Sequence, residues 1–373
     1  MQEESKRIVV KIGSSSLTST QGELSRRKLE KLIHEVVLLK DEGYEVLLVS
    51  SGAVAAGYRR LGFLSRPESL PERQAAASVG QGLLMETYSE LFVSHGYVAS
   101  QILLTRSDLA HEERYNNARN TINVLLERGI IPIVNENDSV TTDELKFGDN
   151  DTLSAKVAAL VDADQLIVLS DVDGLYNGNP ATTPDAELIE EVYHITEDIV
   201  KVAGGSGSKV GTGGMKSKID AFKIAMAAGV SSFLGRSTTA NIIYDAVHAR
   251  AIGTYFIANT EVENLDKKQQ WIAFNSGPEG NIVLKRDRVQ DIVNGLAGIA
   301  PDDIDEISGH FEGKAVVRVL DHKGVELGLG VVNYASVMLK QWDAVDPGLK
   351  TGEELAINVD QFVSHHFHNI TVK

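Results

Sequence analysis

Short apolar runs, each ending in a polar segment with glycine or serine and followed by a stretch of helical spacing, recur over some 260 residues of the chain. This alternation of strands and helices predicts an open, mostly parallel α/β sheet with helices on both faces. The clearest runs are 7–12, 46–49, 130–134 and 165–169. Ligands of such sheets bind beyond the carboxyl ends of the strands. The polar segments that follow these runs are therefore candidates for the functional site.

The most polar segment, 135–155 (NENDSVTTDELKFGDNDTLSA), separates the run 130–134 from a stretch with helical spacing. It contains six carboxylates, three amides and one lysine. A helix cap at Asp149 or Asn150 would explain one or two of these side chains. Because a cap does not explain the whole cluster, we expect this segment to line a ligand site.

Two other runs end in small residues that can bind an anion. Lys11 lies two residues before Gly13, and the loop that begins there can offer N–H groups to a phosphate. The second run leads into Ser51 and Gly52 at the start of a helix, where Ser51 can hold a carboxylate or a phosphate. Simpler explanations remain open: an ordinary strand exit at Gly13, and a serine cap at Ser51 that fits the sequence equally well.

A glycine-rich segment, 204–218 (GGSGSKVGTGGMKSK), opens another helix. The backbone donors and the positive end of the helix dipole favour a phosphate there. Lys216 and Lys218 occupy the first turn, which is unfavourable for lysine unless an anion is bound. The segment lacks the GxxxxGK[ST] pattern of a P-loop. A flexible linker is the simpler alternative, but the immediate helix and the placed lysines favour a phosphate site.

These features together suit phosphoryl transfer, in which N–H groups and lysines grip the phosphate, Mg²⁺ is held and the acceptor is aligned. A hydroxyl acceptor needs a general base, whereas a carboxylate is already ionised. The obstacle for a carboxylate is repulsion between two anions, which lysines and Mg²⁺ can relieve. The clustered motifs contain no histidine, and this favours a carboxylate acceptor.

The pattern changes near the polar segment 259–268. From residue 280 onward, short alternating runs broken by glycine predict a small β-rich domain that can fold independently. We expect an α/β domain over 1–260, a linker over 261–278, and the β-rich domain with a tail over 279–373. His365, His366 and His368 in the tail suggest a metal site, but a solvated tail fits better because no carboxylate pattern accompanies them.

Composition excludes several classes of protein. The net charge of -16 argues against a protein that binds nucleic acid or anionic lipid by bulk electrostatics. The chain has no cysteine, so it has neither disulfides nor thiolate chemistry. Its first apolar run is too short for a signal peptide and no run is long enough to span a membrane. We expect a soluble, cytoplasmic protein.

Six motifs in this order, VVKIGSSSLT, VSSGAVAAG, NENDSV, FGDNDTLSA, SDVDGLY and GTGGMKSK, resemble the glutamate 5-kinases of the amino-acid kinase family. The resemblance covers essentially the whole chain, because SGHFEGKAVVRV and the glycines at 324–330 are similar to a PUA domain. It implies ATP-dependent phosphorylation of the γ-carboxylate of L-glutamate to glutamyl 5-phosphate, the first step of proline synthesis, with Mg²⁺.

The resemblance also implies roles for individual residues. Lys11, Gly13 and Lys218 would contact the phosphates, and Asp151 would orient the two lysines, with Asp149 sharing that task. Glutamate would be bound by Ser51, Asp138 and Asn150, with Asn135 and Lys146 as further candidates. The remaining nucleotide-binding residues would be Ser170, Asp171, Thr212, Gly213, Gly214, Met215, Lys216 and Ser217. No side chain is assigned to the metal. On physical grounds Asp138 suits the ammonium group of glutamate, whereas Asn150 and Ser51 suit a carboxylate.

The resemblance further implies proline as a feedback inhibitor at the glutamate site, a homo-oligomer, and functional coupling to glutamyl 5-phosphate reductase. Ser14 and Ser170 stand where threonine is common in the family, and both keep a hydroxyl. Between 281 and 323 there are six Lys/Arg against eight Asp/Glu, which argues against RNA as a partner. The alternatives are an RNA-binding regulator with a degenerate kinase fold, and a sibling kinase with another acceptor. Asp138 argues against an N-acylated acceptor, and the intact Lys11, Asp151 and Lys218 argue against the regulator.

Overall fold

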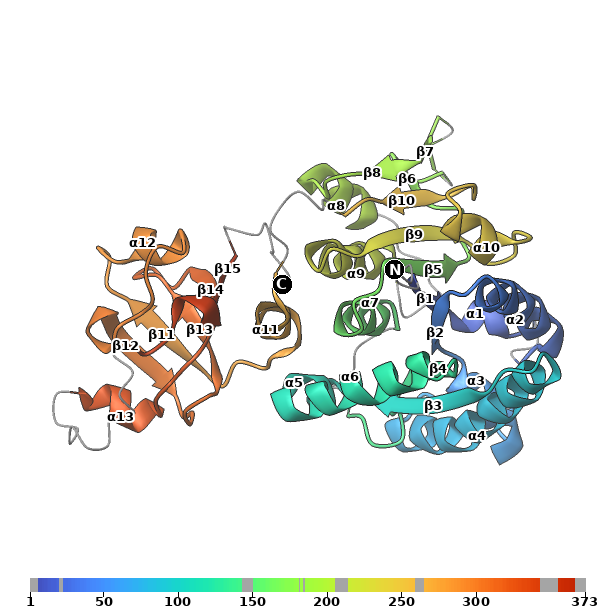
Figure 1. Cartoon of the computed structure of the whole chain (residues 1–373), viewed down its shortest axis with the longest axis horizontal. Helices are drawn as coiled ribbons and strands as arrows, with labels where there is room; N and C mark the ends of the chain where they lie inside the picture. Colours follow the sequence, from blue (N-terminus) through green and yellow to red (C-terminus); the bar gives the residue numbers. More distant parts are fainter. Residues whose placement is uncertain are drawn as a thin grey trace. The chain divides into compact units, whose positions relative to one another are not determined.

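The computed structural model describes residues 6–19, 23–142, 150–180, 182–183, 185–204, 214–258, 265–342 and 355–365. The chain divides into two compact units (Figure 1). The first comprises Met1–Leu109 and Glu113–Glu263, and the second comprises Ala110–Glu112 and Asn264–Lys373.

The first unit is built on an eight-stranded sheet with the order β3-β4-β2-β1-β5-β9-β10-β8. Six neighbouring strands, from β3 to β9, run parallel, and β10 pairs antiparallel to β9. The prediction of a mostly parallel sheet is therefore confirmed. The strands are β1 Arg7–Ile12, β2 Glu45–Ser50, β3 Ala99–Leu104, β4 Ile131–Glu136, β5 Gln165–Ser170, β8 Glu191–Val192, β9 Ser231–Arg236 and β10 Thr254–Phe256.

Helices cover both faces of this sheet. On one face α2 contacts both α4 and α10, and on the other α7 packs on α9 (Figure 1). The central strands are buried almost throughout, as in sheets covered on both sides. The helical segments are α1 Ser14–Leu17, α2 Arg26–Asp41, α3 Ala53–Gly57, η1 Tyr58–Leu61, α4 Leu70–Ser94, α5 Arg106–Ala110, α6 Glu112–Glu127, α7 Asn150–Leu160, α8 Glu197–Gly204, α9 Met215–Ala227 and α10 Ile242–Val247.

The strand register places the polar segments at one edge of the sheet. Ile12 of β1 lies beside Ser50 of β2 and Leu169 of β5. β4 pairs parallel with β2, on the side of β2 away from β1, so the carboxyl end of β4 lies at the same edge of the sheet. The exits of β1, β2, β4 and β5 therefore open onto a common region, as the predicted topology requires.

Two glycines bring α3 and α4 into unusually close contact. A Cβ atom at Gly57 would lie 1.9 Å from the carbonyl oxygen of Ala76, and one at Gly80 would lie 1.8 Å from that of Ala53. Gly52, which precedes α3, has φ +100°, a conformation that other residues rarely adopt. The path from β2 into α3, and the position of α3 against α4, thus depend on glycine.

The second unit contains a five-stranded sheet with the order β12-β11-β13-β14-β15 around its own apolar core. Its strands are β11 Gly280–Leu284, β12 Ile304–Gly309, β13 Val316–Leu320, β14 Glu326–Val331 and β15 Phe362–Ser364. Its helical segments are α11 Lys267–Gln270, the π-helix η2 Trp271–Asn275, α12 Val289–Val293, η3 Pro301–Asp303, α13 Ser336–Lys340 and η6 Val359–Gln361. The range expected as a linker, 261–278, includes α11 and η2.

Several elements have no counterpart in the sequence-based expectations. The small sheet of β6 Leu175–Tyr176 and β7 Leu188–Ile189, the strand β8 and the helix α8 all lie between β5 and β9. Strands of two residues are too short to show a periodic pattern. No helix of the described residues combines the length and apolar character needed to cross a bilayer.

Candidate active site

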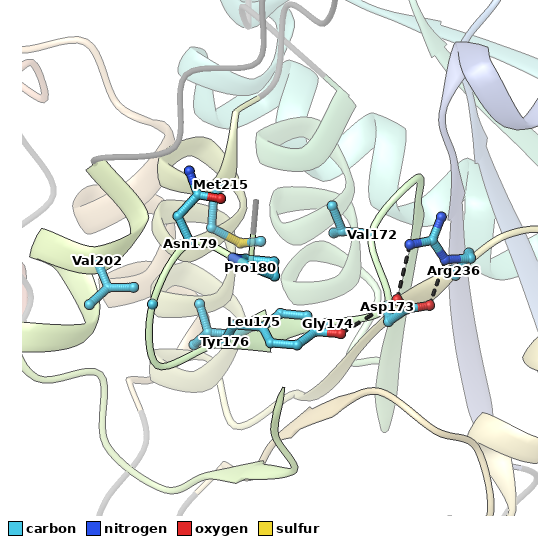
Figure 2. A pocket seen from close by; sticks show the side chains of 11 residues that line it. Val172, Asp173, Gly174, Leu175, Tyr176, Asn179, Pro180, Val202, Met215 and Arg236 are labelled. Carbon is cyan, nitrogen blue, oxygen red and sulfur yellow. Dashed lines mark hydrogen bonds and ion pairs between the residues drawn. The ribbon is translucent and has the colours of Figure 1, made fainter. Parts of the chain in front are cut away.

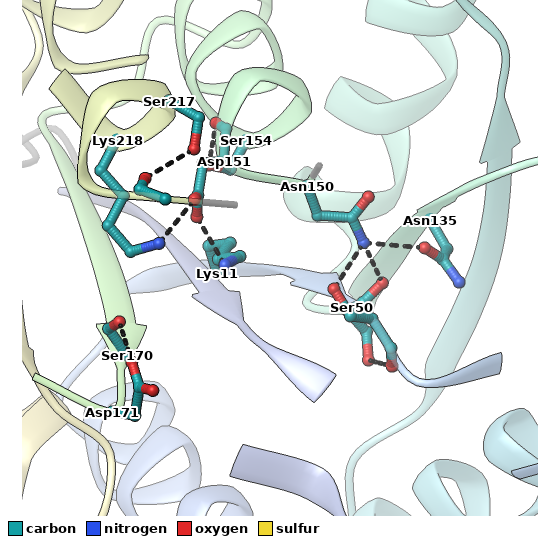
Figure 3. Close-up of polar contacts among 12 residues, drawn as sticks. Lys11, Ser50, Asn135, Asn150, Asp151, Ser154, Ser170, Asp171, Ser217 and Lys218 are labelled. Atoms are coloured by element: carbon teal, nitrogen blue, oxygen red, sulfur yellow. Dashed lines mark hydrogen bonds and ion pairs between the residues drawn. The ribbon is translucent and has the colours of Figure 1, made fainter. Parts of the chain in front are cut away.

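Asp151 lies between two lysines that come from distant parts of the first unit. Lys11 Nζ is 2.5 Å from Asp151 Oδ1, and Lys218 Nζ is 2.9 Å from Asp151 Oδ2 (Figure 3). Lys11 is on β1, Asp151 in the first turn of α7, and Lys218 in the first turn of α9. The structure therefore brings together the three residues that the sequence nominated for catalysis.

This ionic cluster is almost fully buried. Asp151 is 0% exposed, and Lys11 and Lys218 are each 6% exposed. Burial alone would raise the pKa of Asp151, but the two lysines outweigh it and hold the pKa below the ordinary carboxyl value. Two ammonium groups share one carboxylate, so the cluster keeps an excess of positive charge. An excess of positive charge attracts an anion that approaches the lysines.

Beside this cluster, Asn150 joins the ends of β2 and β4. Its amide nitrogen Nδ2 lies within hydrogen-bond distance of the Ser50 carbonyl oxygen (2.7 Å), Ser51 Oγ (2.9 Å) and Asn135 Oδ1 (3.0 Å) (Figure 3). The structure thus gathers Ser51, Asn135 and Asn150, three of the residues nominated for the substrate. We call Ser50, Ser51, Asn135 and Asn150 the amide cluster.

The orientation of Asn150 bears on the role expected for it. Its amide protons are engaged by the three acceptors, and Figure 3 shows its carbonyl oxygen pointing away from them. An amide oxygen accepts hydrogen bonds, so it suits an ammonium group better than a carboxylate. Ser51 Oγ accepts from Asn150 and keeps its own proton for donation to an anion.

Asp138 lies two residues beyond β4, in a turn. Its N–H donates to the Glu136 carbonyl oxygen at 2.9 Å, and its side chain is half-buried. The Thr141 N–H and hydroxyl both donate to the Asn137 carbonyl oxygen, at 3.2 and 2.8 Å, and close the turn. The carboxylate of Asp138 thus follows Asn135 of the amide cluster by three residues in the sequence.

The residues nominated for the nucleotide occupy the exits of β1 and β5 and the start of α9. A Cβ atom at Gly13 would lie 3.5 Å from Lys11 Nζ, so the chain passes close to the ionic cluster there. Ser170 Oγ donates to Asp171 Oδ1 at 3.1 Å. Gly214 precedes α9, and Ser217 Oγ donates to the Gly214 carbonyl oxygen at 2.8 Å, while Lys216 is exposed. Four residues nominated or discussed for this site, Lys146, Asp149, Thr212 and Gly213, lie outside the described part of the chain, as do His366 and His368 of the tail.

A cavity of about 400 Å³ adjoins Met215, the first residue of α9 (Figure 2). Its wall includes Arg236, whose Nε and Nη2 donate to Asp173 at 2.5 and 2.9 Å. The bond with Arg236 lowers the pKa of the Asp173 carboxyl. The other lining residues are Val172, Gly174, Leu175, Tyr176, Gly178, Asn179, Pro180 and Val202.

Sequence reasoning singled out Met215 but gave no role to the rest of this wall. The segment after β5 was recognised as polar, yet only Ser170 and Asp171 were nominated from it. Arg236 ends β9, another parallel strand of the sheet. The rule that ligands gather at strand ends would have identified this residue.

The chain matches two family models, the amino acid kinase family over residues 6–234 and a PUA-like domain over residues 282–339. It is 59% identical over 367 residues to "Glutamate 5-kinase 2" of Bacillus licheniformis, which spans 98% of each chain. It is 63% identical over 336 residues to "Glutamate 5-kinase 2" of Bacillus subtilis, which spans 90% of each chain.

Among solved structures, the carbamate kinase of Giardia lamblia bound to AMP-PNP aligns with 69% of this chain and 99% of its own. The TM-score is 0.51 at 18% sequence identity, so the likeness concerns the fold. The sheet topology, the two family models and the high identity to full-length relatives agree. The chain belongs to the amino acid kinase family, among its glutamate 5-kinases, and carries a PUA-like domain at its C-terminal end.

Proposed function

We propose that the protein transfers the γ-phosphoryl group of ATP to the γ-carboxylate of L-glutamate and so forms glutamyl 5-phosphate for proline synthesis. The observation that carries this proposal is the cluster of Lys11, Asp151 and Lys218, which adjoins the amide cluster through consecutive residues of α7. One cluster supplies positive charge for phosphates, and the other supplies neutral groups that can orient an amino acid.

The nucleotide is proposed to enter through the cavity beside Met215. A volume of about 400 Å³ suits part of a small ligand, and the apolar walls of Val172, Leu175 and Val202 suit a base. The start of α9, a helix of 13 residues, then offers backbone donors to the phosphates. The first turn of that helix connects the two regions, because Met215 lines the cavity and Lys218 belongs to the ionic cluster.

Glutamate is proposed to bind at the amide cluster. Asp138 and the carbonyl oxygen of Asn150 would accept from its ammonium group, and Ser51 would donate to its α-carboxylate. Its side-chain carboxylate would then extend toward Lys11. Asn135 acts by holding Asn150, and Lys146 remains a proposed contact to the substrate.

The chemistry needs no general base. An oxygen of the glutamate side chain attacks the γ-phosphorus, the bond to the bridging oxygen breaks, and ADP leaves with that oxygen. The two reacting groups are both anions, so the principal barrier is their repulsion. Lys11 and Lys218 can neutralise that charge, and Asp151 keeps both ammonium groups pointed at one place.

Mg²⁺ is proposed to arrive with the nucleotide. Within the described ranges no group of three His, Cys, Asp or Glu side chains could hold a metal, and both oxygens of Asp151 face lysines. Mg²⁺ in such sites keeps several waters and is bound largely by phosphate oxygens. When bound it would supply further positive charge to the phosphates.

Proline is proposed to compete for the amide cluster, because it carries the same α-carboxylate and a secondary ammonium group. Assembly into a homo-oligomer and coupling to glutamyl 5-phosphate reductase are proposed from the family alone. A reductase that takes the acyl phosphate directly would limit its hydrolysis.

The deciding experiment traps the acyl phosphate. The full chain is incubated with ATP, Mg²⁺ and hydroxylamine, and with glutamate, aspartate or acetylglutamate in turn. Formation of the hydroxamate from glutamate alone is the expected result. Reaction with another acid while glutamate stays inert would contradict the proposal. The matched negative control is Lys218→Ala, which keeps the amide cluster.

A further inference from the structure

The helix α4 presents three polar side chains at intervals of seven residues, Gln74, Gln81 and Tyr88. Seven residues are close to two helical turns, so the three lie along one face of the helix. Each bonds to a different segment of the acceptor region. Neither composition nor the motifs of the chain single out these residues.

Gln74 Nε2 donates to the Thr141 carbonyl oxygen at 3.1 Å, in the turn that carries Asp138. Gln81 Oε1 accepts from Asn135 Nδ2 at 2.9 Å. The Tyr88 hydroxyl lies 2.9 Å from Ser50 Oγ. Since Ser50 Oγ donates to the Ser51 carbonyl oxygen at 3.2 Å, the Tyr88 hydroxyl is the donor of this pair. Burial raises the pKa of Tyr88, so the hydroxyl keeps its proton.

We propose that Gln74, Gln81 and Tyr88 form a positioning stripe that holds the acceptor end of the active site, with Gln81 acting on glutamate through Asn135 and Asn150. The proposal rests on the function proposed above. None of the three is a catalytic residue, because each acts through another group.

The polarity of the network supports a positioning role for Gln81. Asn135 Oδ1 is fixed as an acceptor by the Glu136 N–H at 2.9 Å and by Asn150 Nδ2 at 3.0 Å. Asn135 Nδ2 must therefore point to Gln81, and Gln81 must present its oxygen. A flipped Gln81 would set one donor against another.

This orientation leaves Gln81 Nε2 buried without an acceptor among the described residues. Gln81 as a whole is 9% exposed. A buried donor without an acceptor lowers stability, and a site that keeps one is expected to serve function. Here Gln81 Oε1 orients Asn135, and Gln81 Nε2 lacks an acceptor because the side chain must turn its oxygen toward Asn135.

The close contact between α3 and α4 also links the positioning stripe to the segment that contains Ser51. Gly80, adjacent to Gln81, lies against Ala53 at the start of α3. Ser51 precedes that start by two residues. The same stretch of α4 therefore sets both the hydrogen-bond partner of Asn135 and the position of the Ser51 segment.

The test compares Gln81→Met with the wild-type full chain. The substitution removes the Gln81 nitrogen that lacks an acceptor and leaves Asn135 Nδ2 without the acceptor it has in Gln81, so one unsatisfied buried donor nitrogen replaces another. We expect the KM for glutamate to rise about tenfold, with kcat changed less than about threefold and the KM for ATP unchanged. The melting temperature should stay within about 3 °C of wild type.

Two further variants separate positioning from general stability. Leu84→Val, in the core face of α4, should lower the melting temperature and leave the KM for glutamate unchanged. Asn135→Ala should raise that KM, and adding Gln81→Met to it should cause little further change, because the two act in series.

A Gln81→Met variant with an unchanged KM for glutamate, or a double variant whose effects simply multiply, would overturn the stripe. Failure of the wild type to use glutamate would instead overturn the proposed function. In that case the KM of Gln81→Met and of wild type is compared for the amino acid that the wild type does accept, and an unchanged KM would again contradict the positioning role.

Discussion

The two halves of the candidate active site are built from different kinds of interaction. The cluster of Lys11, Asp151 and Lys218 uses full charges in a buried setting, and the amide cluster uses neutral hydrogen bonds fixed by backbone groups. Charge acts on whatever negative group is near, whereas neutral groups act only at a defined distance and angle. We therefore propose that the first half serves the reaction and that the second serves recognition.

The largest effect is expected from removing one of the two lysines. Lys11→Ala or Lys218→Ala should lower kcat by about 10²–10³, because each removes charge stabilisation that grows as the phosphoryl group transfers. The KM for glutamate should change far less. Steady-state kinetics with hydroxamate detection measures both. Lys223→Ala, on the same helix but paired with Asp220, is the control and should stay near wild type.

Asp151→Asn tests the centre of the charged half. It leaves two buried ammonium groups without their carboxylate, so we expect a loss of about 3–5 kcal/mol in the free energy of unfolding and a large drop in kcat. The folded pKa of Asp151 lies below its unfolded value. Its stabilisation is therefore complete above the unfolded pKa and is lost as the pH falls through the folded one. Denaturant unfolding at pH 7 and below pH 4 should show that the difference in unfolding free energy between wild type and Asp151→Asn is smaller at the lower pH. An equal difference at both pH values would argue against the ion pairs.

Asp138, which is proposed to bind glutamate beside the amide cluster, should respond in the opposite way. Asp138→Ala is expected to raise the KM for glutamate by about 10–100-fold and to lower kcat less, because it removes a partner of the bound ammonium group. Asp138→Asn is the matched variant, since it keeps the shape and loses the charge. An unchanged KM in the alanine variant would mean that Asp138 does not contact glutamate.

The smallest effect concerns Glu35, a buried carboxylate with a different environment from Asp151. Its Oε2 accepts from the N–H of Ile243 at 2.7 Å and that of Tyr244 at 3.3 Å. Burial raises its pKa to about 7 despite these bonds, because the backbone donors stabilise the charge less than burial disfavours it.

With a folded pKa above the unfolded one, Glu35 makes stability fall as the pH rises from about 4.5 to about 7. Glu35→Gln should remove about 1–3 kcal/mol of this pH dependence, measured by urea denaturation between pH 4 and 8. The activity at saturating substrates should be unchanged. A parallel pair of stability curves would show that Glu35 does not titrate in this range.

The sheet was predictable because the central strands are largely apolar runs followed by a polar segment, as in 46–49 and 130–134. The ionic cluster was nominated through the family motifs, and the residues alone pointed only to lysines and carboxylates near strand ends. The pairing of Asp151 with both lysines needed the register of β1, α7 and α9, which no local pattern contains.

Other parts of the site could not be read from the chain. Gln81 is one polar residue in a helix that is mostly apolar and small, and its partner Asn135 is far away in the sequence. Arg236 forms its ion pair with Asp173 because β9 lies next to β5 in the sheet. The orientation of Asn150 depends on which of its atoms faces the backbone of β2, and the sequence carries no signal for that choice.

Asn150 and Asp151 are neighbours in the chain, so the first turn of α7 carries one residue of the amide cluster and one residue of the ionic cluster. An acceptor one methylene shorter than glutamate, anchored at the same groups, would stop short of the phosphorus. Discrimination by acceptor length would then depend on the spacing of two main-chain neighbours, which an insertion or deletion at the start of α7 would change.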